Sequence, residues 1–354
     1  MVQLPIARVR DGDVICQDVF TKRGNLLFSK GRTITPRDIE ILQAFIIPSV
    51  AIDTDASQDH ERFQDIMKNT AEAAQIAPFY VEYDKLVKLL KKAFPAIAAG
   101  SFPILDIRTQ LEKLLAQCQD YKILSFTPPK SAPADYFYHK SIQVSLTAHM
   151  LGKWHGLPSK DWTQIALAGL FHDIGNVKID PGILQKPGKL TRDEFEEVKR
   201  HTVYGYHLLR GIPGINEGVK LAALQHHERE DGSGYPLGAK SEKIHIYAKI
   251  VAIADTFHAM TGKRHYKNRI SPYLVLEEIY NSSFGKLDPS LVLNFIERVT
   301  QLHNGATVRL NDNSVGEIIF TDRMNPTRPW VNVNGNIINL SLERNLYIQE
   351  LVKH

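Results

Sequence analysis

The sequence predicts a mainly α-helical protein. It has an all-helical bundle at its centre, preceded by a small α+β unit and a helical linker and followed by a short β-rich unit. Three observations support this. Apolar residues recur at helical spacing through the middle of the chain. All but His60 and His354 of the 14 histidines lie between residues 139 and 303, within that helical part. After His303 the pattern changes to short, strand-like stretches.

Length and composition indicate a soluble protein with several structural units. A chain of 354 residues is longer than one small core requires and suggests two or three units. We divide the chain into residues 1–55 (a small mixed α/β unit), 56–130 (a helical linker or regulatory region), 131–303 (the central domain) and 304–354 (a small β-rich unit). Hydrophobic residues make up 43% and charged residues 23% of the chain, which is ordinary for a globular protein.

Net charge, cysteine content and hydropathy narrow the function classes. A formal net charge of +4 indicates no nucleic-acid surface, although it would not repel an anionic nucleotide. Two cysteines, Cys16 and Cys118, show no spacing pattern and fit a reducing compartment. No apolar run approaches the ~20 residues of a membrane helix, and residues 1–12 lack the apolar core of a signal peptide. We therefore expect a cytoplasmic protein that binds neither nucleic acid nor a membrane.

The first predicted unit carries signals for short strands and one helix. Residues 14–20 and 26–28 are strand candidates. Thr35 is expected to cap a helix that begins at Pro36, and residues 49–52 are a further strand candidate. A sensor or docking role for this unit stays open, but plain packing against the next unit is the interpretation we favour.

The predicted linker is helical. An apolar stripe at helical spacing runs through it: Leu86, Leu89, Leu90 and Phe94. Such a stripe is typical of a helical bundle or of a dimer-forming linker, so a homodimer remains open. Three prolines are expected to break the helices: Pro78, Pro95 and Pro103. The segment 127–133, which contains three more prolines, is the predicted domain boundary.

Helix-start signals order the central domain. Ser159 is expected to cap a helix that ends at His172-Asp173. Thr191 and Glu194 have the spacing of a capping box, at the start of a helix that is expected to carry His201. Two more helices are expected over residues 215–228 and 244–260. The ligand candidates below therefore lie on helices or at their ends, an arrangement that can build an inward-facing metal site.

The last unit is expected to be a small sheet. Its strand candidates are residues 307–310, 315–320, 330–333, 337–340 and 346–351. Asn334-Gly335, between two of these strands, is a strong hairpin signal. We assign this unit no function.

The residues that carry chemistry are histidines and aspartates at intervals of one to two helices. They are two doublets and two single residues: His172-Asp173, His226-His227, His201 and Asp255. Neutral imidazole and carboxylate are the ligands of a site for two divalent first-row ions, and a shared carboxylate can bridge the ions. The alternative is that these histidines fill a core. That alternative suits any one of them, but it explains two doublets and two singles between residues 172 and 255 poorly.

Further landmarks around these residues support a family resemblance. They are His201-Thr202 with Gly205, the loop 184–191, the run His226 to Pro236 (HHEREDGSGYP) and Ile253-Ala254-Asp255. Residues 131–300 resemble an HD-GYP domain, a branch of the HD metal-dependent phosphohydrolases that cleaves cyclic dinucleotides, chiefly cyclic di-GMP. The run that ends in Gly-Tyr-Pro is far more specific than the His-Asp doublet alone. The resemblance implies an HD-type helical bundle around the metal site.

The resemblance also implies roles for the ligands. Asp173 would bridge the two ions, and the remaining ligands would divide into His172 with Asp255 and His201 with His226 and His227. A bridging water would be the nucleophile, with iron or manganese as the ions. Some family members bind a third metal through a Glu and a His four residues later. The ungapped register places Tyr136 and Lys140 at these positions, whereas a one-residue shift places Asp135 and His139 there. We favour the ungapped register and hence two ions.

Other positions are expected to bind substrate. Gly234 and Tyr235 belong to a loop that lies beside the active site in the family and is proposed to contact partner proteins. A structural turn is the alternative. Arg264 and Lys267 resemble basic residues that hold substrate phosphates in the family, with a solvated basic turn as the alternative. Asn176 stands where the family has a lysine that faces the scissile phosphate.

The missing lysine affects the expected activity. Lys178 lies two residues further along and is the substitute that we assign, although its reach is open. His258, which replaces a family acid, is expected to be a neighbour of the site rather than a ligand. The resemblance implies a phosphodiesterase that opens cyclic di-GMP to linear pGpG, with GMP as a further product. Two alternatives remain: a slow or inactive member that acts as a cyclic-dinucleotide receptor or protein-docking module, and a generic HD phosphohydrolase for another nucleotide.

Overall fold

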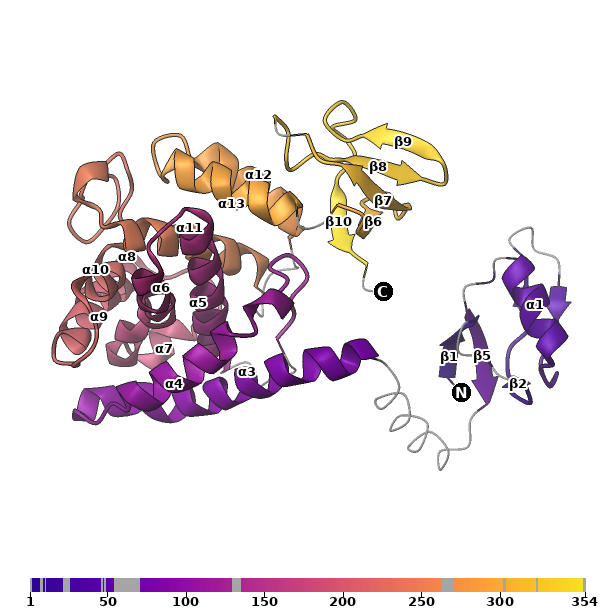
Figure 1. Cartoon of the computed structure of the whole chain (residues 1–354), viewed down its shortest axis with the longest axis horizontal. Helices are drawn as coiled ribbons and strands as arrows, with labels where there is room; N and C mark the ends of the chain where they lie inside the picture. Colours follow the sequence, from indigo (N-terminus) through magenta and orange to yellow (C-terminus); the bar gives the residue numbers. More distant parts are fainter. Residues whose placement is uncertain are drawn as a thin grey trace. The chain divides into compact units, whose positions relative to one another are not determined.

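The chain divides into two compact units. The computed structural model describes residues 2–6, 9, 11–21, 26–45, 47, 49–53, 71–128, 135–262, 270–301, 304–322 and 324–352. The first unit is Met1–Ala77 and the second is Pro78–His354 (Figure 1). The predicted boundary at residue 130 falls inside the second unit. The four-part division of the chain therefore stays a prediction.

The first unit is a small α+β fold. Its strands form a three-stranded antiparallel sheet in the order β1-β5-β2 and a separate hairpin: β1 (Val2–Pro5), β5 (Ser49–Asp53), β2 (Val14–Ile15), β3 (Val19–Phe20) and β4 (Leu26–Phe28). Helix α1 (Pro36–Ala44) begins at the predicted residue. Its first turn is held by a reciprocal pair, in which Asp38 N–H donates to Thr35 Oγ1 (3.3 Å) and Thr35 N–H donates to Asp38 Oδ2 (3.1 Å). The predicted cap at Thr35 is confirmed.

The predicted linker helices belong to the core of the second unit. Helix α3 (Ala71–Ala96) continues through Pro78 and Pro95, so the prediction that these prolines break it is wrong. A proline removes one helical hydrogen bond, and the buried apolar face of the helix offsets that loss. The face carries Tyr83, Leu86, Leu90 and Phe94, each completely buried. It packs within this chain's own core, as the bundle interpretation of the stripe predicts, and the homodimer stays a prediction.

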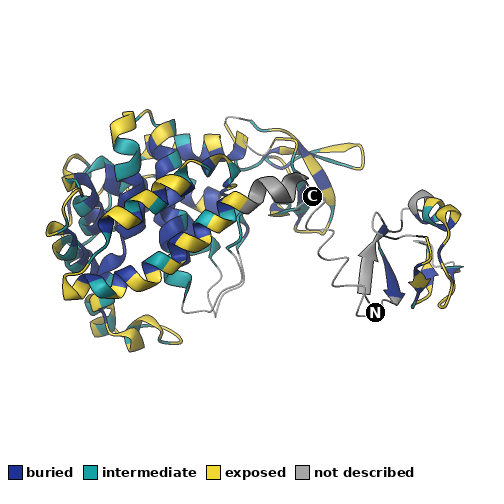
Figure 2. Ribbon diagram, turned by 60° about the horizontal axis from the view of Figure 1, so that its bottom comes forward, coloured by how far each residue is buried: buried dark blue, intermediate teal, exposed yellow. Residues whose placement is uncertain are grey.

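Helices dominate the rest of the second unit, as predicted. In chain order they are η2 (Ile97–Ala99), α4 (Ile104–Leu115), η3 (Cys118–Asp120), α5 (Tyr136–Trp154), α6 (Ser159–Phe171), η5 (Ile174–Lys178), α7 (Pro181–Leu184), α8 (Arg192–Lys199), α9 (His201–Arg210), α10 (Glu217–Gln225), η6 (Ser241–Lys243), α11 (Ile246–Thr261), α12 (Pro272–Ser282) and α13 (Pro289–Gln301). Their inward faces are buried and their outward faces exposed (Figure 2). This amphipathic pattern indicates one helical core.

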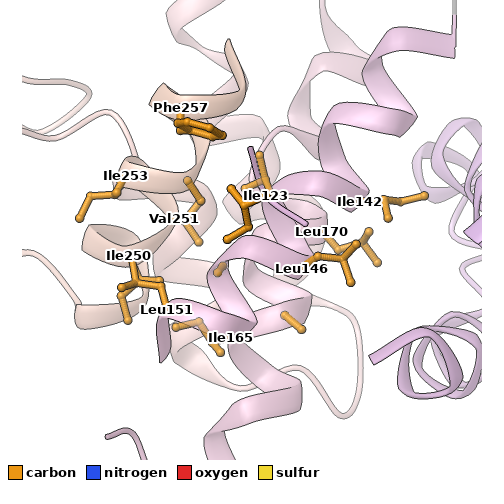
Figure 3. Packing of buried hydrophobic residues seen from close by; sticks show 14 of the residues in the cluster. Ile123, Ile142, Leu146, Leu151, Ile165, Leu170, Ile250, Val251, Ile253 and Phe257 are labelled. Carbon is orange, nitrogen blue, oxygen red and sulfur yellow. The ribbon is translucent and has the colours of Figure 1, made fainter. Parts of the chain in front are cut away.

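The centre of this core lies between α5, α6 and α11. Leu146 of α5, Ile165 of α6 and Ile250 of α11 are completely inaccessible to solvent and lie close together in Figure 3. Burying a side chain of this size contributes about 1.5–3 kcal/mol to folding. The same helices carry or lead into several of the ligand candidates, so the apolar packing also positions the site.

Two local predictions in this domain need correction. Ser159 is the first residue of α6, and the N-cap is Pro158, which makes no side-chain capping bond. The capping box of Thr191 and Glu194 is present, but it starts α8, which ends before His201. At this break, His201 Nδ1 donates to Val198 O (2.6 Å), so an imidazole N–H satisfies a carbonyl of the last turn of α8.

The C-terminal strands form one antiparallel sheet in the order β10-β6-β7-β8-β9. They are β6 (Thr307–Leu310), β7 (Val315–Phe320), β8 (Trp330–Val333), β9 (Asn336–Asn339) and β10 (Ile348–Leu351). The predicted hairpin is confirmed, because Asn334 (φ 52°) and Gly335 (φ 88°) both adopt the positive φ that a tight turn between β8 and β9 requires. Among the described helices, none combines the length and apolar character needed to cross a membrane.

Candidate metal centre

Two groups of possible metal ligands meet at Asp173. One group is Asp173 with His201, His226 and His227, and the other is His172, Asp173 and Asp255. The two carboxylate oxygens of Asp173 divide between the groups. Oδ1 lies 3.3 Å from Nε2 of His201 and 3.7 Å from Nε2 of His226. Oδ2 lies 3.2 Å from Nε2 of His172.

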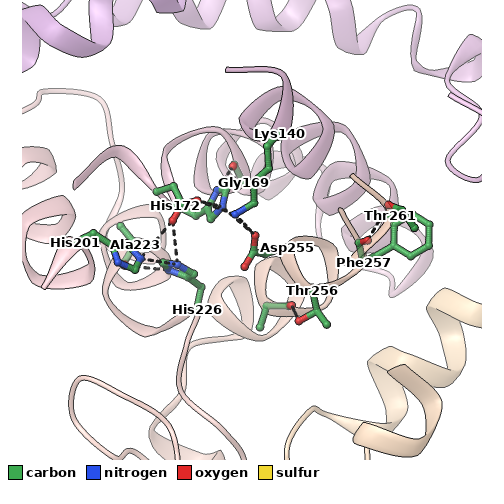
Figure 4. A network of polar contacts seen from close by, with 12 residues as sticks. Lys140, Gly169, His172, His201, Ala223, His226, Asp255, Thr256, Phe257 and Thr261 are labelled. Carbon is green, nitrogen blue, oxygen red and sulfur yellow. Dashed lines mark hydrogen bonds and ion pairs between the residues drawn. The ribbon is translucent and has the colours of Figure 1, made fainter. Parts of the chain in front are cut away.

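Helix ends converge to build the site (Figure 4). His172 and Asp173 follow α6 directly, and His201 is the first residue of α9. His226 ends α10, whereas Asp255 projects from within α11. The predicted ligands therefore come together from four helices, although His172 and Asp255 are 83 positions apart in sequence. These helices hold the side chains on rigid backbone rather than on loops.

Backbone carbonyls orient three of the imidazole rings. Nδ1 of His172 donates to Gly169 O (2.8 Å), and Nδ1 of His201 to Val198 O (2.6 Å). Nδ1 of His226 donates to Ala222 O (3.0 Å). In a neutral ring, each bond selects the tautomer that leaves Nε2 unprotonated, and these Nε2 atoms face Asp173. A carbonyl partner on the second ring nitrogen is the usual way in which a protein orients a histidine ligand.

Unpaired buried atoms show that divalent cations fit this site. Nε2 of His172 is buried and makes no hydrogen bond of good geometry among the described residues, although carboxylate oxygens lie 3.2 and 3.4 Å away. Oδ1 of Asp255 is likewise buried without a hydrogen bond in the described part of the chain. A polar atom left in this state costs free energy unless something binds it. Coordination would satisfy both atoms.

The charges of the site leave most of the ligands, but not His172, ready to bind a metal ion near neutral pH. Burial would raise the pKa values of Asp173 and Asp255, but the neighbouring Lys140 ammonium outweighs burial and holds both well below their usual range. Burial lowers the pKa of His201 to about 4 and that of His227 well below its usual value, so both rings are neutral. Burial also opposes protonation of His172, but Asp173 overrides it and raises the pKa of His172 to about 9. A metal ion bound by His172 would therefore displace a proton from this ring.

Lys140 is a site residue that our assignments omit. Its Nζ lies 2.8 Å from Oδ2 of Asp173 and 2.6 Å from Oδ1 of Asp255. The sequence signal for it was the ungapped register, which places Lys140 at a family ligand position. The residues of the shifted register bond elsewhere: Nδ1 of His139 lies 3.0 Å from the Tyr83 hydroxyl, and Asp135 pairs with Lys91 at 2.7 Å. The geometry favours the ungapped register, and the number of ions stays a prediction.

The loop after His227 folds back onto the site. The buried Glu228 carboxylate accepts hydrogen bonds from the backbone N–H groups of Leu237 (2.7 Å) and Ala239 (2.9 Å), which closes the loop. The ring of Tyr235 stacks on His227, with 4.7 Å between centroids. A Cβ at Gly234 would lie 2.4 Å from His227 O, so only glycine permits this approach. Gly234 and Tyr235 therefore lie beside the metal ligands.

Of the other predicted site residues, two lie next to the metal ligands in sequence without a described side-chain contact to them, and two lie outside the described residues. Asn176 is half-buried in η5, and its backbone N–H donates to Asp173 O (2.9 Å). Lys178 ends η5 with an exposed side chain. Arg264 and Lys267 lie outside the described residues.

His258 belongs to a buried network that our sequence reasoning missed. Its Nε2 lies 2.7 Å from Thr147 Oγ1 and 3.4 Å from the Tyr121 hydroxyl. Burial lowers the pKa of His258 to about 3, so the ring is neutral. The network ties η3 and α5 to α11 within one turn of Asp255, in keeping with the expectation that His258 neighbours the site.

Comparison with known proteins agrees with this geometry. Residues 120–291 match the family model of the HD domain. The matched segment contains every ligand candidate and the complete run His226 to Pro236. The match agrees with the resemblance of residues 131–300 to an HD-GYP domain. The domain starts within the helical core, and its flanking segments continue that core on both sides.

Curated relatives match between 42% and 52% of this chain. A cyclic di-GMP phosphodiesterase of Pseudomonas aeruginosa is 34% identical over 52% of this chain and 44% of its own. A cyclic di-GMP phosphodiesterase response regulator of Xanthomonas campestris is 40% identical over 42% of this chain and 40% of its own. The 3'3'-cGAMP-specific phosphodiesterase 2 of Vibrio cholerae is 35% identical over 44% of this chain and 30% of its own. The chain thus spans less than half the length of each of these relatives.

Proposed function

We propose that this protein is a metal-dependent phosphodiesterase that hydrolyses cyclic di-GMP. The observation that carries the proposal is the position of Asp173, whose Oδ1 faces His201 and His226 while Oδ2 faces His172. One carboxylate can then hold two ions side by side. Relatives named for cyclic di-GMP hydrolysis match 52% and 42% of this chain.

Two bound ions would lower the pKa of a bridging water toward neutrality and clamp the oxygens of an in-line displacement at phosphorus. The protein supplies the frame for this chemistry. His201 and His227 are neutral and can bind an ion without first losing a proton. The hydrogen bond of His172 to Gly169 O aims Nε2 into the site. Imidazole and carboxylate ligands suit iron or manganese.

Further residues are proposed to bind the substrate. Tyr235 stacks on His227 at the edge of the centre, where its ring can contact a guanine. Arg264 and Lys267 are proposed to hold the phosphates, because a guanidinium binds phosphate oxygens in a bidentate manner. The loop containing Gly234 is also proposed to contact a signalling partner. The first product is linear pGpG, and a second cut would release GMP.

A second candidate function is a cyclic-dinucleotide receptor with slow turnover. Asn176 favours it, because an amide cannot stabilise developing negative charge as the family lysine does. The generic HD hydrolase is disfavoured because the chain keeps the complete run His226 to Pro236. The relative named for cGAMP makes this dinucleotide a second substrate to test.

The test measures metal content and turnover together. Protein purified without oxygen is analysed for iron and manganese, and the loss of cyclic di-GMP and of cGAMP is followed by chromatography with each metal added. We expect metal-dependent formation of pGpG, and its loss in Asp173→Asn, which keeps the size of the side chain but not its charge. The matched control is Asp180→Asn, because Asp180 is exposed and caps α7. Tight binding without product would instead establish the receptor function.

A further inference from the structure

The two ligand groups differ in their contact with a fixed positive charge. The Lys140 ammonium touches the two carboxylates of the His172 group, at 2.8 Å from Asp173 Oδ2 and 2.6 Å from Asp255 Oδ1. The side chain is 12% exposed, so water screens it little. In the other group, the oxygen that faces His201 and His226 is Oδ1 of Asp173, not the oxygen bound by Lys140. The cation therefore acts on one side of the bridge.

We propose that Lys140 makes the two ion positions unequal, so that the histidine-rich position fills first and the position formed by His172, Asp173 and Asp255 fills last and exchanges readily. This inference rests on the metal centre of the proposed function and concerns its regulation. Loading the second ion would then switch the phosphodiesterase on only when the metal is abundant.

The argument is one of competition for shared oxygens. A carboxylate offers several lone-pair directions, so Asp173 and Asp255 can accept the ammonium and a metal ion together. A dication held by these oxygens would nevertheless lie within a few ångströms of the ammonium, in a buried place where like charges repel strongly. The histidine-rich position offers three imidazoles and the far oxygen of Asp173. An ion there meets less repulsion and should bind more tightly.

Lys140 also balances the charge of the two carboxylates. Two buried carboxylates with lowered pKa values would repel each other, and the ammonium between them compensates their charge. A second metal ion must therefore either displace the Lys140 ammonium from these carboxylates or bind beside it. Lys140 changes the affinity of the site for metal ions, so it is a positioning residue rather than a catalytic one.

The test uses Mn²⁺ alone, without nucleotide. Metal-free full-length protein is titrated with Mn²⁺, and free ion is measured by its electron paramagnetic resonance signal. We expect the wild type to bind two Mn²⁺ ions in two binding steps, whose dissociation constants differ at least tenfold. Lys140→Met, which keeps the length of the chain without the charge, should tighten the second step at least tenfold. Lys140→Arg should keep the two steps apart.

The matched control lies on the same helix. Lys153 of α5 is exposed, with its ammonium over the Trp162 ring, so Lys153→Met should leave both steps unchanged. His172→Ala should remove the weak step and leave the tight one, which identifies the positions even if Lys140→Met does not fold without metal. Circular dichroism of each metal-free variant checks folding.

Three results would overturn the inference: two equal steps in the wild type, an unchanged second step in folded Lys140→Met, or loss of the tight step in His172→Ala. The proposed function is judged separately by product formation. Unequal steps that Lys140→Met brings together, without any hydrolysis, would support the inference and refute the phosphodiesterase. Hydrolysis with equal steps would do the reverse.

Discussion

Replacing Gly175 by alanine is expected to separate Asp173 from His201 and empty part of the metal centre. Gly175 lies in η5, where that element touches the start of α9. A Cβ at this position would lie 1.9 Å from His201 O and 2.6 Å from Gly205 N. Both are backbone atoms, so no side-chain rotation can relieve the contact. The alanine must push η5 away from α9.

The size of that shift follows from ordinary contact distances. A carbon and a carbonyl oxygen approach to about 3.3 Å at closest, so the gap beside His201 O must open by about 1.4 Å from its 1.9 Å. A metal–ligand distance can depart from its ideal value by only about 0.2 Å. Asp173 is two residues from Gly175 and His201 carries the opposing carbonyl, so the shift acts directly on the ligand pair. Overpacking of this kind costs about 1–3 kcal/mol of folding free energy.

The assay compares metal content and melting temperature. The Gly175→Ala protein should retain at most one ion and melt about 2–12 °C lower than the wild type, at about 2–4 °C per kcal/mol for a unit of this size. Gly211→Ala is the matched control, because nothing lies within 4 Å of its Cβ position. A Gly175→Ala protein with both ions and an unchanged melting temperature would refute the reasoning.

Three further predictions concern the substrate, the chemistry and the core. Arg264→Ala should weaken nucleotide binding at unchanged metal content, and equal affinity in calorimetry would assign Arg264 to a solvated turn. Asn176→Lys should raise the single-turnover rate roughly a hundredfold with little change in affinity, since a preorganised donor contributes about 2–4 kcal/mol. If the wild type is already fast and the lysine variant is no faster, another cation already stabilises the developing charge. The third concerns pH. Burial lowers the pKa of His258 to about 3, so below about pH 6.5 the unfolded chain takes up a proton that the folded protein does not. The free energy of unfolding should therefore decrease as the pH is lowered from about 6.5 toward about 3, by up to about 1.4 kcal/mol per pH unit. His258→Gln should lose this part of the slope in urea titrations, whereas the exposed His207→Gln should keep it.

Local signals in the sequence determined much of the fold and of the metal site. The capping box of Thr191 and Glu194 and the turn at Asn334-Gly335 appear as expected, because each depends on residues at most three apart. The ligand set was also legible, since His172-Asp173 and His226-His227 are neighbours in the chain. Their chemistry identifies them before their distances are known.

Other features depended on packing between distant segments. The prolines of α3 suggested broken helices, but the helix is continuous because the apolar face around Leu86 and Leu90 packs into the core. The sequence could not show that this face is buried within its own chain rather than in a dimer. An apolar stripe looks the same in both cases.

The tertiary structure alone decided which cation enters the metal centre. From the chain, Lys178 was the nearer candidate to Asn176, yet its side chain is exposed at the end of η5. Lys140 reaches Asp173 across 33 positions of sequence, because α5 packs along α6 and α11 and turns one face toward their carboxylates. Spacing identifies which side chains can bind a metal, but the charge that acts on them depends on which helices pack together.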